Sequence, residues 1–179
     1  MTPYGAPLHP ILIHFPIVLL ITAVVLGFVA SLPKLHQFRI IELVLLCIGG
    51  IAAIIAKEAG EQSEHAFREA IHRSSTSADV FNTHSKLATG VILVFGLITL
   101  LRLGTWAWQV WKQRQELLSK KSQPLQLLAG VILHSQTVPL VILIIYLLGG
   151  LVGVGLLTAT GYYGGELVYT YGVGISAKP

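Results

Sequence analysis

Four long stretches of this sequence carry little or no charge, and they limit what the chain can fold into. They are residues 10–32, 40–56, 87–101 and 124–165. About 20 consecutive apolar residues cross the hydrocarbon core of a bilayer as a helix, which satisfies its own backbone hydrogen bonds there. The composition agrees, with 54% hydrophobic residues, 11% charged residues and a mean hydropathy of +0.74. The sequence therefore predicts membrane-spanning helices.

We expect an all-α integral membrane protein whose helices form a four-helix bundle. The spans are predicted at about residues 10–32, 40–57, 82–103 and 138–160. The chain has 179 residues and short connections, so we treat residues 1–179 as a single membrane domain. Residues 1–10 contain no Lys or Arg, so the first span lacks the basic region of a signal peptide and is expected to remain as a membrane helix.

The third and fourth helices are predicted to be longer than the bilayer requires. Residues 102–118 keep apolar side chains at helical spacing between charged ones, so the third helix is expected to continue into the cytoplasm. Residues 125–133 are expected to pair with its end as a cytoplasmic hairpin, with a bend near residues 134–139, where proline removes a helix hydrogen bond. The alternative is a short interfacial helix before a span that starts at about Val138.

The connection between the second and third spans is polar but patterned. Residues 57–79 place acidic and basic side chains around apolar ones at helical spacing. They predict either a helical extension of the second span or an amphipathic helix on the outer surface. The cluster Ser-Ser-Thr-Ser at residues 74–77 predicts the turn that ends this segment.

The basic residues predict how the bundle is oriented. Four spans place both termini on one side of the membrane. The loops on the other side carry seven Lys or Arg and two Glu, whereas the side of the termini carries five basic and six acidic residues. Basic residues favour the cytoplasmic side, so both termini are expected on the non-cytoplasmic side of a bacterial inner or equivalent membrane. The pI near 9.3 follows from this asymmetry, so nucleic-acid binding is not needed to explain it.

Three histidines are the main functional signal. Residues 9–16 read His-Pro-Ile-Leu-Ile-His-Phe-Pro, and His84 opens the third span on the same side of the membrane. His14 lies about one turn into the first helix and His84 near the start of the third, so we expect both to reach one level of the bundle. Two imidazoles from different helices can be the axial ligands of a haem iron, or two ligands of another metal ion. His9 is a further candidate in more polar surroundings.

Several other residues favour or exclude particular classes of function. A haem needs small neighbours, which Ala88 and Gly90 provide. Cys47 is the only cysteine, which excludes an internal disulfide and the Cys-x-x-Cys-His attachment of c-type haem. Glu42 is expected to extend toward water at the cytoplasmic end of the second span. Because the outer halves of the spans lack acidic residues, an ion transporter is the least favoured class.

Taken singly, most of the histidines have a simpler interpretation. A histidine at a membrane interface often only donates a hydrogen bond to a backbone carbonyl or a lipid headgroup. This alternative applies to His9, His36, His65, His72 and His134. For the pair His14 and His84, ligation and a structural role both stay open.

Glycines crowd the C-terminal segment around Glu166. They are Gly161, Gly164, Gly165, Gly172 and Gly174. Such a density predicts tight turns with positive φ outside the fourth span. Glu166 is expected either to orient a ligand histidine or to pair with Lys86 or Arg73. The alternative is a tail that folds back and caps the bundle.

The ends of the chain resemble a known family. The motifs are the opening His-Pro-Ile-Leu-Ile-His-Phe-Pro-Ile at residues 9–17, His84, the closing Thr-Gly-Tyr-Tyr-Gly-Gly-Glu-Leu-Val-Tyr at residues 160–169, and Gly-Val-Gly at residues 172–174. Together they resemble the bacterial predicted membrane proteins called Domain of Unknown Function 2231 over essentially the whole chain. The resemblance implies a four-helix membrane protein without an established activity, similar in layout to the b-type cytochromes. Members often carry a histidine before the final Gly-Val-Gly, where this chain has Tyr171, and the difference argues against a second haem there.

The expected function is electron transfer. We expect a membrane-bound protein that holds haem b between His14 and His84 near the non-cytoplasmic face, without substrate chemistry of its own. His9 and Glu166 are additional cofactor-binding candidates. The alternative is a non-catalytic structural or assembly subunit of a larger respiratory or photosynthetic membrane complex. In either case the lipid bilayer and other membrane protein subunits are the expected partners.

Overall fold

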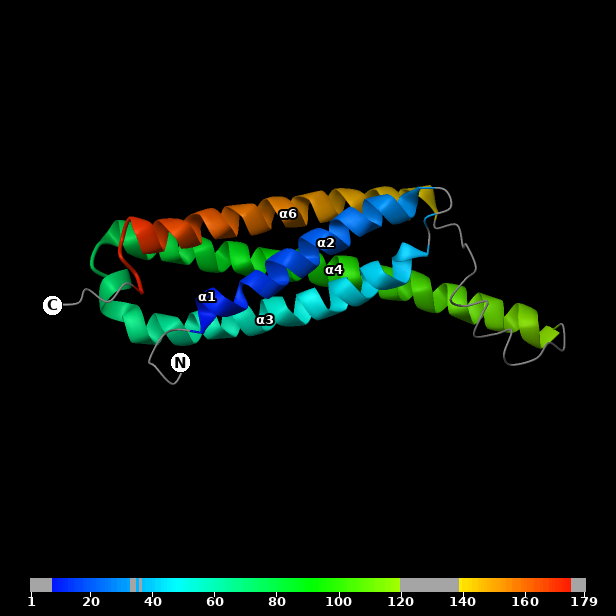
Figure 1. The fold of residues 1–179 in the computed structure, drawn as a ribbon, viewed down its shortest axis with the longest axis horizontal. Helices are drawn as coiled ribbons and strands as arrows, with labels where there is room; N and C mark the ends of the chain where they lie inside the picture. The colour runs from blue at the N-terminus through cyan, green and yellow to red at the C-terminus, as the bar shows by residue number, and fades with distance from the viewer. Residues whose placement is uncertain (1–7, 33–34, 36, 120–138, 175–179) are drawn as a thin grey trace.

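The structure is a computed structural model that describes residues 8–32, 35, 37–119 and 139–174, of which about 90% are helical and none lies in a strand. Its helices are α1 (His9–Leu12), α2 (His14–Ser31), α3 (Phe38–Ile71), α4 (Ser75–Ser119) and α6 (Leu140–Tyr169), shown in Figure 1. The described residues contain four helical segments long and apolar enough to cross a membrane: His9–Ser31, Phe38–His65, Ser75–Gln115 and Leu140–Tyr169. The predicted all-α membrane fold is therefore confirmed.

The first span is two helices in succession. Pro16 has no backbone N–H, so it cannot donate to the carbonyl of Leu12 as a continuous helix requires. Ile13 between the two helices keeps helical backbone angles, with φ −63° and ψ −25°, and its N–H donates to the carbonyl of His9 at 3.1 Å. The two helices therefore follow one helical path, and His9 and His14 are related by the ordinary helical rotation.

The connection from α3 to α4 is a helical extension, one of the two forms predicted for it. α3 continues to Ile71, with a kink at Phe67, where φ is −115° and ψ is 18°. The turn comes slightly earlier than predicted, because most of the serine cluster already belongs to α4. Ser74 Oγ accepts the N–H of Ser77 at 3.1 Å, and Ser77 Oγ accepts the N–H of Ser74 at 3.3 Å. This reciprocal capping starts α4 at Ser75.

Two helices run beyond the predicted spans. α4 continues to Ser119, as its patterning predicts. α6 begins after Pro139 and continues to Tyr169 through three of the C-terminal glycines, so the turns predicted around Glu166 are wrong for Gly161, Gly164 and Gly165. Among the glycines that the structure describes, those with positive φ follow the helix: Gly172 (67°) and Gly174 (83°). The predicted hairpin at 125–133 and most of the predicted bend lie outside the described residues.

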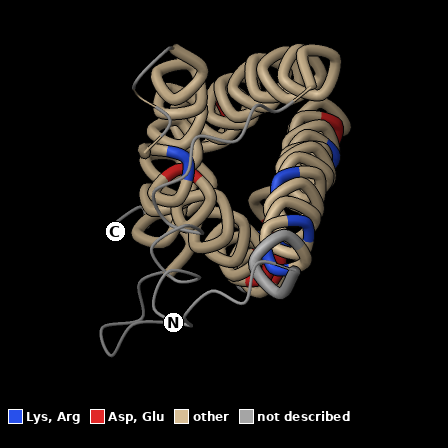
Figure 2. Tube along the Cα trace, turned by 90° about the vertical axis from the view of Figure 1, so that its right-hand side faces the viewer, with Lys and Arg blue, Asp and Glu red and all other residues tan. Residues whose placement is uncertain are grey.

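Large apolar side chains cover the outside of the bundle. Leu97, Leu100 and Leu140 are each about two-thirds exposed or more, at 67%, 66% and 70%. Figure 2 looks along the bundle and shows few charged positions among the helices. A water-soluble monomer rarely exposes so much apolar surface, whereas lipid tails cover it in a bilayer. The fold and its surface therefore fit a membrane environment.

The bundle consists of two similar halves. In the first half, Leu20 of α2 packs against Gly49 of α3, and a Cβ at Gly49 would lie 2.7 Å from Leu20 Cδ2. In the second half, Phe95 of α4 packs against Gly153 of α6, where a Cβ would lie 2.7 Å from Phe95 Cε2. All four residues are buried. The halves thus repeat the same close approach of two helices around an approximate two-fold axis along the bundle.

The same relation extends along the helices. The separation in sequence from Leu20 to Phe95 also relates His9 to His84, so the two histidines occupy equivalent positions in α1 and α4. The separation from Gly49 to Gly153 defines equivalent positions of α3 and α6 in the same way. The start of α1, the α3–α4 turn and the end of α6 all lie at one end of the bundle, here called the histidine end (Figure 1).

The opposite end contains a buried ion pair. Glu42 of α3 is 0% exposed, and Arg102 Nε of α4 donates to its Oε1 at 3.0 Å while Arg102 Nη2 donates to Oε2. The predicted extension of Glu42 toward water is therefore wrong. The guanidinium also lies 5.1 Å from the ring centre of Tyr146, which occupies in α6 the position of Glu42 in α3. At this end of the bundle the two halves therefore differ, because α3 carries a carboxylate at the position where α6 carries a phenol.

Candidate cofactor site

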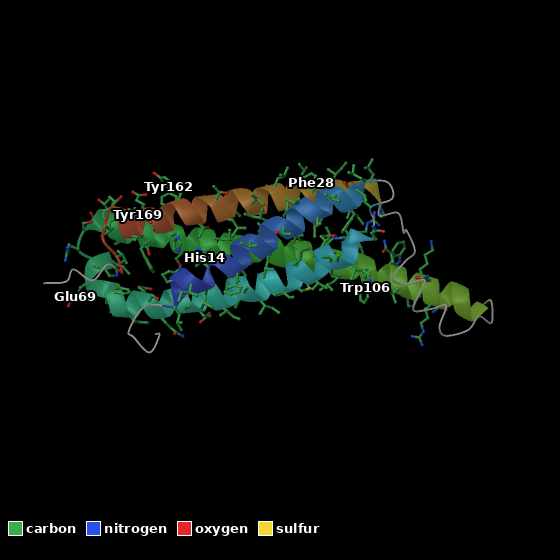
Figure 3. The ribbon with its side chains drawn as sticks, in the orientation of Figure 1. His14, Phe28, Glu69, Trp106, Tyr162 and Tyr169 are labelled. Carbon is green, nitrogen blue, oxygen red and sulfur yellow. The ribbon has the colours of Figure 1, made fainter. Side chains whose placement is uncertain are left out.

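Two imidazoles meet at the histidine end. The ring centres of His9 and His84 are 6.1 Å apart, and their planes are nearly perpendicular at 86°. Sequence analysis paired His84 with His14, but the structure pairs it with His9 and leaves His14 exposed on α2 (Figure 3). His9 and His14 are five residues apart, and five residues of an α-helix rotate by about 500°, which is one full turn and about 140° more. The two side chains therefore face directions about 140° apart. Two histidines at the same depth therefore meet only if their side chains also face each other, which His9 and His84 do.

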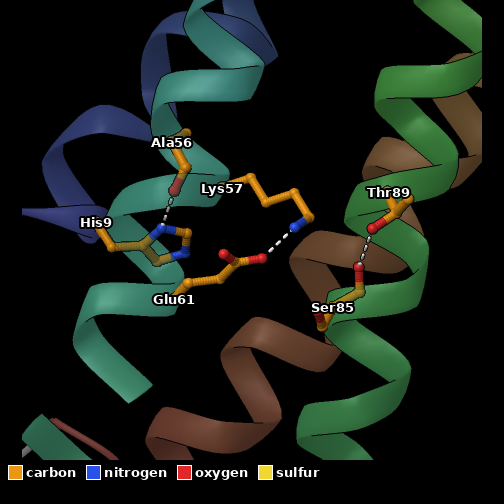
Figure 4. Close-up of polar contacts among 6 residues, drawn as sticks. All are labelled: His9, Ala56, Lys57, Glu61, Ser85 and Thr89. Carbon is orange, nitrogen blue, oxygen red and sulfur yellow. Dashed lines mark hydrogen bonds and ion pairs between the residues drawn. The ribbon is translucent and has the colours of Figure 1, made fainter. Parts of the chain in front are cut away.

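Each imidazole is held through Nδ1. His9 Nδ1 donates to the carbonyl of Ala56 in α3 at 2.7 Å (Figure 4), and His84 Nδ1 donates to the carbonyl of Thr160 in α6 at 2.9 Å. A carbonyl oxygen only accepts, so Nδ1 carries the hydrogen and Nε2 of the neutral ring keeps its lone pair. A hydrogen bond of this kind behind the ring is the usual support of a histidine that ligates a metal.

A glycine lies against each ring. Gly60 follows the acceptor Ala56 by four residues, and a Cβ there would lie 3.1 Å from both Cε1 and Nδ1 of His9. Gly164 follows Thr160 by four residues, and a Cβ there would lie 3.1 Å from Cε1 of His84. In an α-helix the residue four positions on lies beside the carbonyl that it bonds, so glycine leaves that carbonyl open to a side chain from another helix. Each half therefore provides a histidine, a backbone carbonyl that accepts its hydrogen bond, and a glycine that leaves room for the ring.

The imidazoles line a cavity of about 540 Å³ between the helices. Its walls are mostly apolar, and small residues from three helices widen it: Ala53, Ala56, Gly60, Ala88, Gly161 and Gly164. Of the two small residues expected beside His84, Ala88 lines the cavity, whereas Gly90 lies against Leu156, 3.6 Å from where its Cβ would be. Pockets for small molecules and cofactors usually measure about 300–1,000 Å³, so this cavity has the size of a ligand site.

The C-terminal tail closes part of the cavity. Val173 and Gly174 belong to its lining, and Gly174 lies close to Phe67 at the α3 kink. The N–H of Val173 donates to the carbonyl of Leu167 at 3.0 Å, and this turn folds the tail back over the end of the bundle. The described part of the tail therefore folds back over the bundle, as expected in the alternative to a role for Glu166 in orienting a histidine or pairing with a cation.

Glu166 and the other histidines of this end lie outside the cavity lining. Glu166 is half-buried in α6, and among the described residues its carboxylate has no hydrogen bond or ion pair. It therefore does not orient His9 or His84, which use backbone carbonyls. His65 and His72 are exposed. The carbonyl acceptors and the two glycines are the site features that sequence analysis missed, although the four-residue spacing Ala56–Gly60 and Thr160–Gly164 is visible in the sequence.

Two imidazoles suit a metal ion whose remaining ligands come from a cofactor and not from the protein. No group of three or more His, Cys, Asp or Glu side chains is placed to hold a metal ion within the part of the chain that the structure describes. A structural zinc ion takes four protein ligands, of which two imidazoles are half. A porphyrin supplies four nitrogens to its iron and leaves two axial positions. The 6.1 Å between ring centres also suits one metal ion, since two bonds of about 2.0 Å and the near half of each ring must fit between them.

The comparisons with known proteins identify the family and nothing more specific. No curated protein and no solved structure matches the chain. One family profile, described as a predicted membrane protein, matches residues 5–177 and so covers nearly the whole sequence. The chain belongs to this family of membrane proteins, Domain of Unknown Function 2231.

Proposed function

We propose that the protein is a membrane-bound electron-transfer protein that holds one haem b between His9 and His84. The observation that carries the proposal is the matched pair of imidazoles: each ring has Nδ1 bonded to a carbonyl, and their centres are 6.1 Å apart beside a largely apolar cavity. His9 takes the place that sequence analysis gave to His14. The proposal keeps the predicted cofactor and changes one of its two ligands.

The chain's own residues have three tasks in this function. His9 and His84 would hold the haem iron through Nε2. The carbonyls of Ala56 and Thr160 fix the ring orientation and raise the basicity of Nε2. The apolar walls exclude water, which affects the reduction potential. Haem iron supplies one-electron chemistry when it is bound.

The charge distribution supports an orientation with the histidine end on the non-cytoplasmic side. Seven of the twelve Lys and Arg residues lie in or next to the loops of the opposite end, with two of the eight acidic residues. Basic loops favour the cytoplasm. The haem would then lie near the non-cytoplasmic face, where it can exchange electrons with a soluble partner or a neighbouring membrane subunit.

The direct test of haem binding is a visible spectrum of the full chain purified in detergent, before and after reduction with dithionite. A bis-histidine haem b protein should show sharpened absorption bands on reduction and about one haem per chain in a pyridine assay. A purified protein with no haem absorption, even after expression with added haem precursor, would overturn the proposal.

A second function has support from the same contacts. The bonds from His9 to Ala56 and from His84 to Thr160 each tie two helices together, which is what a purely structural histidine does. A non-catalytic subunit of a larger membrane complex would use the histidines in this way. It predicts a haem-free protein in which His9→Gln, which keeps an N–H donor, retains the thermal stability that His9→Ala loses. Haem ligation predicts that both substitutions lose the cofactor.

A further inference from the structure

We infer that Lys57 binds the carboxylate groups of the cofactor and so determines which edge of the ring lies against α3. The inference rests on the proposed haem site and names the residue that recognises the charged part of the ligand. It comes from a difference between the two halves of the bundle.

Each half of the bundle contributes one histidine to the cavity, but the charged side chains that line it lie on α3, in the first half. Lys57 and Glu61 of α3 both line the cavity. The residues at the equivalent positions of α6 are Gly161 and Gly165, which line it as well. The α6 wall is therefore uncharged and without side chains at these two positions, whereas the α3 wall carries the cation of Lys57, the carboxylate of Glu61 and the further carboxylate of Glu64. A ligand with one apolar edge and one anionic edge fits such a cavity in one direction.

Lys57 is next to the residue that holds the first imidazole. It follows Ala56, whose carbonyl accepts the hydrogen bond of His9. Its Nζ donates to Glu61 Oε1, and in Figure 4 the two side chains extend from α3 on the side of α4. The side chains of Lys57 and Glu61 are 24% and 48% exposed. An ion pair this accessible, between positions i and i+4, is weak, so Lys57 can exchange Glu61 for a carboxylate of the ligand.

The chemistry of haem b requires such a partner. Its macrocycle is apolar, and its two propionate groups are carboxylates at one edge. A carboxylate that enters a largely apolar cavity needs a cation or water to offset its desolvation. Lys57 is the one Lys or Arg among the described residues that line the cavity. The propionate edge therefore lies at Lys57, the apolar edge lies on the glycines of α6, and the displaced Glu61 carboxylate is solvated.

The test compares two ligands on the haem-free full chain in detergent: haem b, and haem b dimethyl ester, whose carboxylates are esterified. The unmodified protein should bind haem b about tenfold more tightly than the ester, the effect of one charge-assisted contact. Lys57→Gln should remove this preference by weakening haem b alone. Glu61→Gln should tighten haem b, because Lys57 is then free of its competitor, and leave the ester unchanged.

The control is Lys86→Gln, which removes an exposed cation of α4 outside the cavity lining and should change neither affinity. Equal affinities of the unmodified protein for the two ligands would overturn the role of Lys57. So would a Lys57→Gln variant that keeps the full preference, or one that weakens the binding of the ester as much as that of haem b. If the unmodified protein binds the two ligands equally well, the proposed haem site survives. If it binds neither, the proposed function fails and this inference fails with it.

Discussion

Gly60 of α3 lies so close to the imidazole of His9 that an added methyl group would approach Nδ1 and Cε1 to 3.1 Å. The glycine leaves room for the ring exactly where the ring must reach the carbonyl of Ala56. Gly164 does the same for His84 in the other half. Small residues in membrane helices usually serve helix packing. Here two of them serve the placement of side chains, and this distinguishes them from the other glycines of the bundle.

Gly60→Ala should therefore weaken haem binding without weakening the fold. The methyl group displaces the ring of His9 by a few tenths of an ångström, whereas alanine improves the helix by up to about 1 kcal/mol. We expect lower haem occupancy at equal or higher thermal stability, and the same result for Gly164→Ala. Haem per chain and the midpoint of thermal unfolding check both. Gly155→Ala is the control, since no atom lies within 4 Å of its Cβ position. Equal haem occupancy in all three variants would show that the glycines do not position the rings.

The Glu42–Arg102 pair should be the most sensitive polar contact of the fold. Arg102→Met removes the cation that bonds both oxygens of the buried Glu42 carboxylate and leaves the electrostatic attraction of Arg39 in place. Loss of one partner of a buried pair costs about 3–5 kcal/mol. We expect unfolding in detergent at a markedly lower temperature or denaturant concentration. The double variant Glu42→Gln, Arg102→Met should recover most of this loss because the buried carboxylate is replaced by a neutral amide. A single variant as stable as the unmodified protein would mean that water reaches the carboxylate.

The proposed orientation can be tested by labelling single cysteines. Cys47 is first replaced by alanine, and a cysteine is then introduced at Glu69, at the histidine end, or at Lys112, on the α4 extension. Both positions are exposed. A membrane-impermeant maleimide added to intact cells should label the first variant and not the second, because basic loops stay in the cytoplasm. Labelling of Lys112→Cys alone would invert the orientation. Lysed cells, in which both must react, are the control.

The membrane fold could be predicted from the sequence because it depends on local properties. Helix formation in lipid follows from the length and apolarity of a stretch, and the patterning of residues 102–118 indicates the extension of α4. The same physics explains the error at Gly161: glycine permits a turn in water, but at a membrane surface the helix keeps its backbone bonds satisfied and therefore continues.

The site could be predicted only in part, because it depends on direction and on contacts between distant segments. The sequence places His9, His14 and His84 at the same end, but the rotation along the helix decides which of the first two faces inward. The two-fold repeat is equally hidden in the sequence, since equivalent buried positions carry different residues, such as Leu20 and Phe95. Only their packing shows that they correspond.

The most direct test of the account is the haem content of three variants purified in parallel: His9→Ala, His84→Ala and His14→Ala. The first two remove the facing imidazoles, whereas the third removes an exposed histidine of the same segment. The account predicts that His9→Ala and His84→Ala lose haem while remaining in the membrane as helical proteins, and that His14→Ala keeps about one haem per chain. Full haem in His9→Ala together with its loss from His14→Ala would contradict the account and restore the ligand pair that the sequence alone favours.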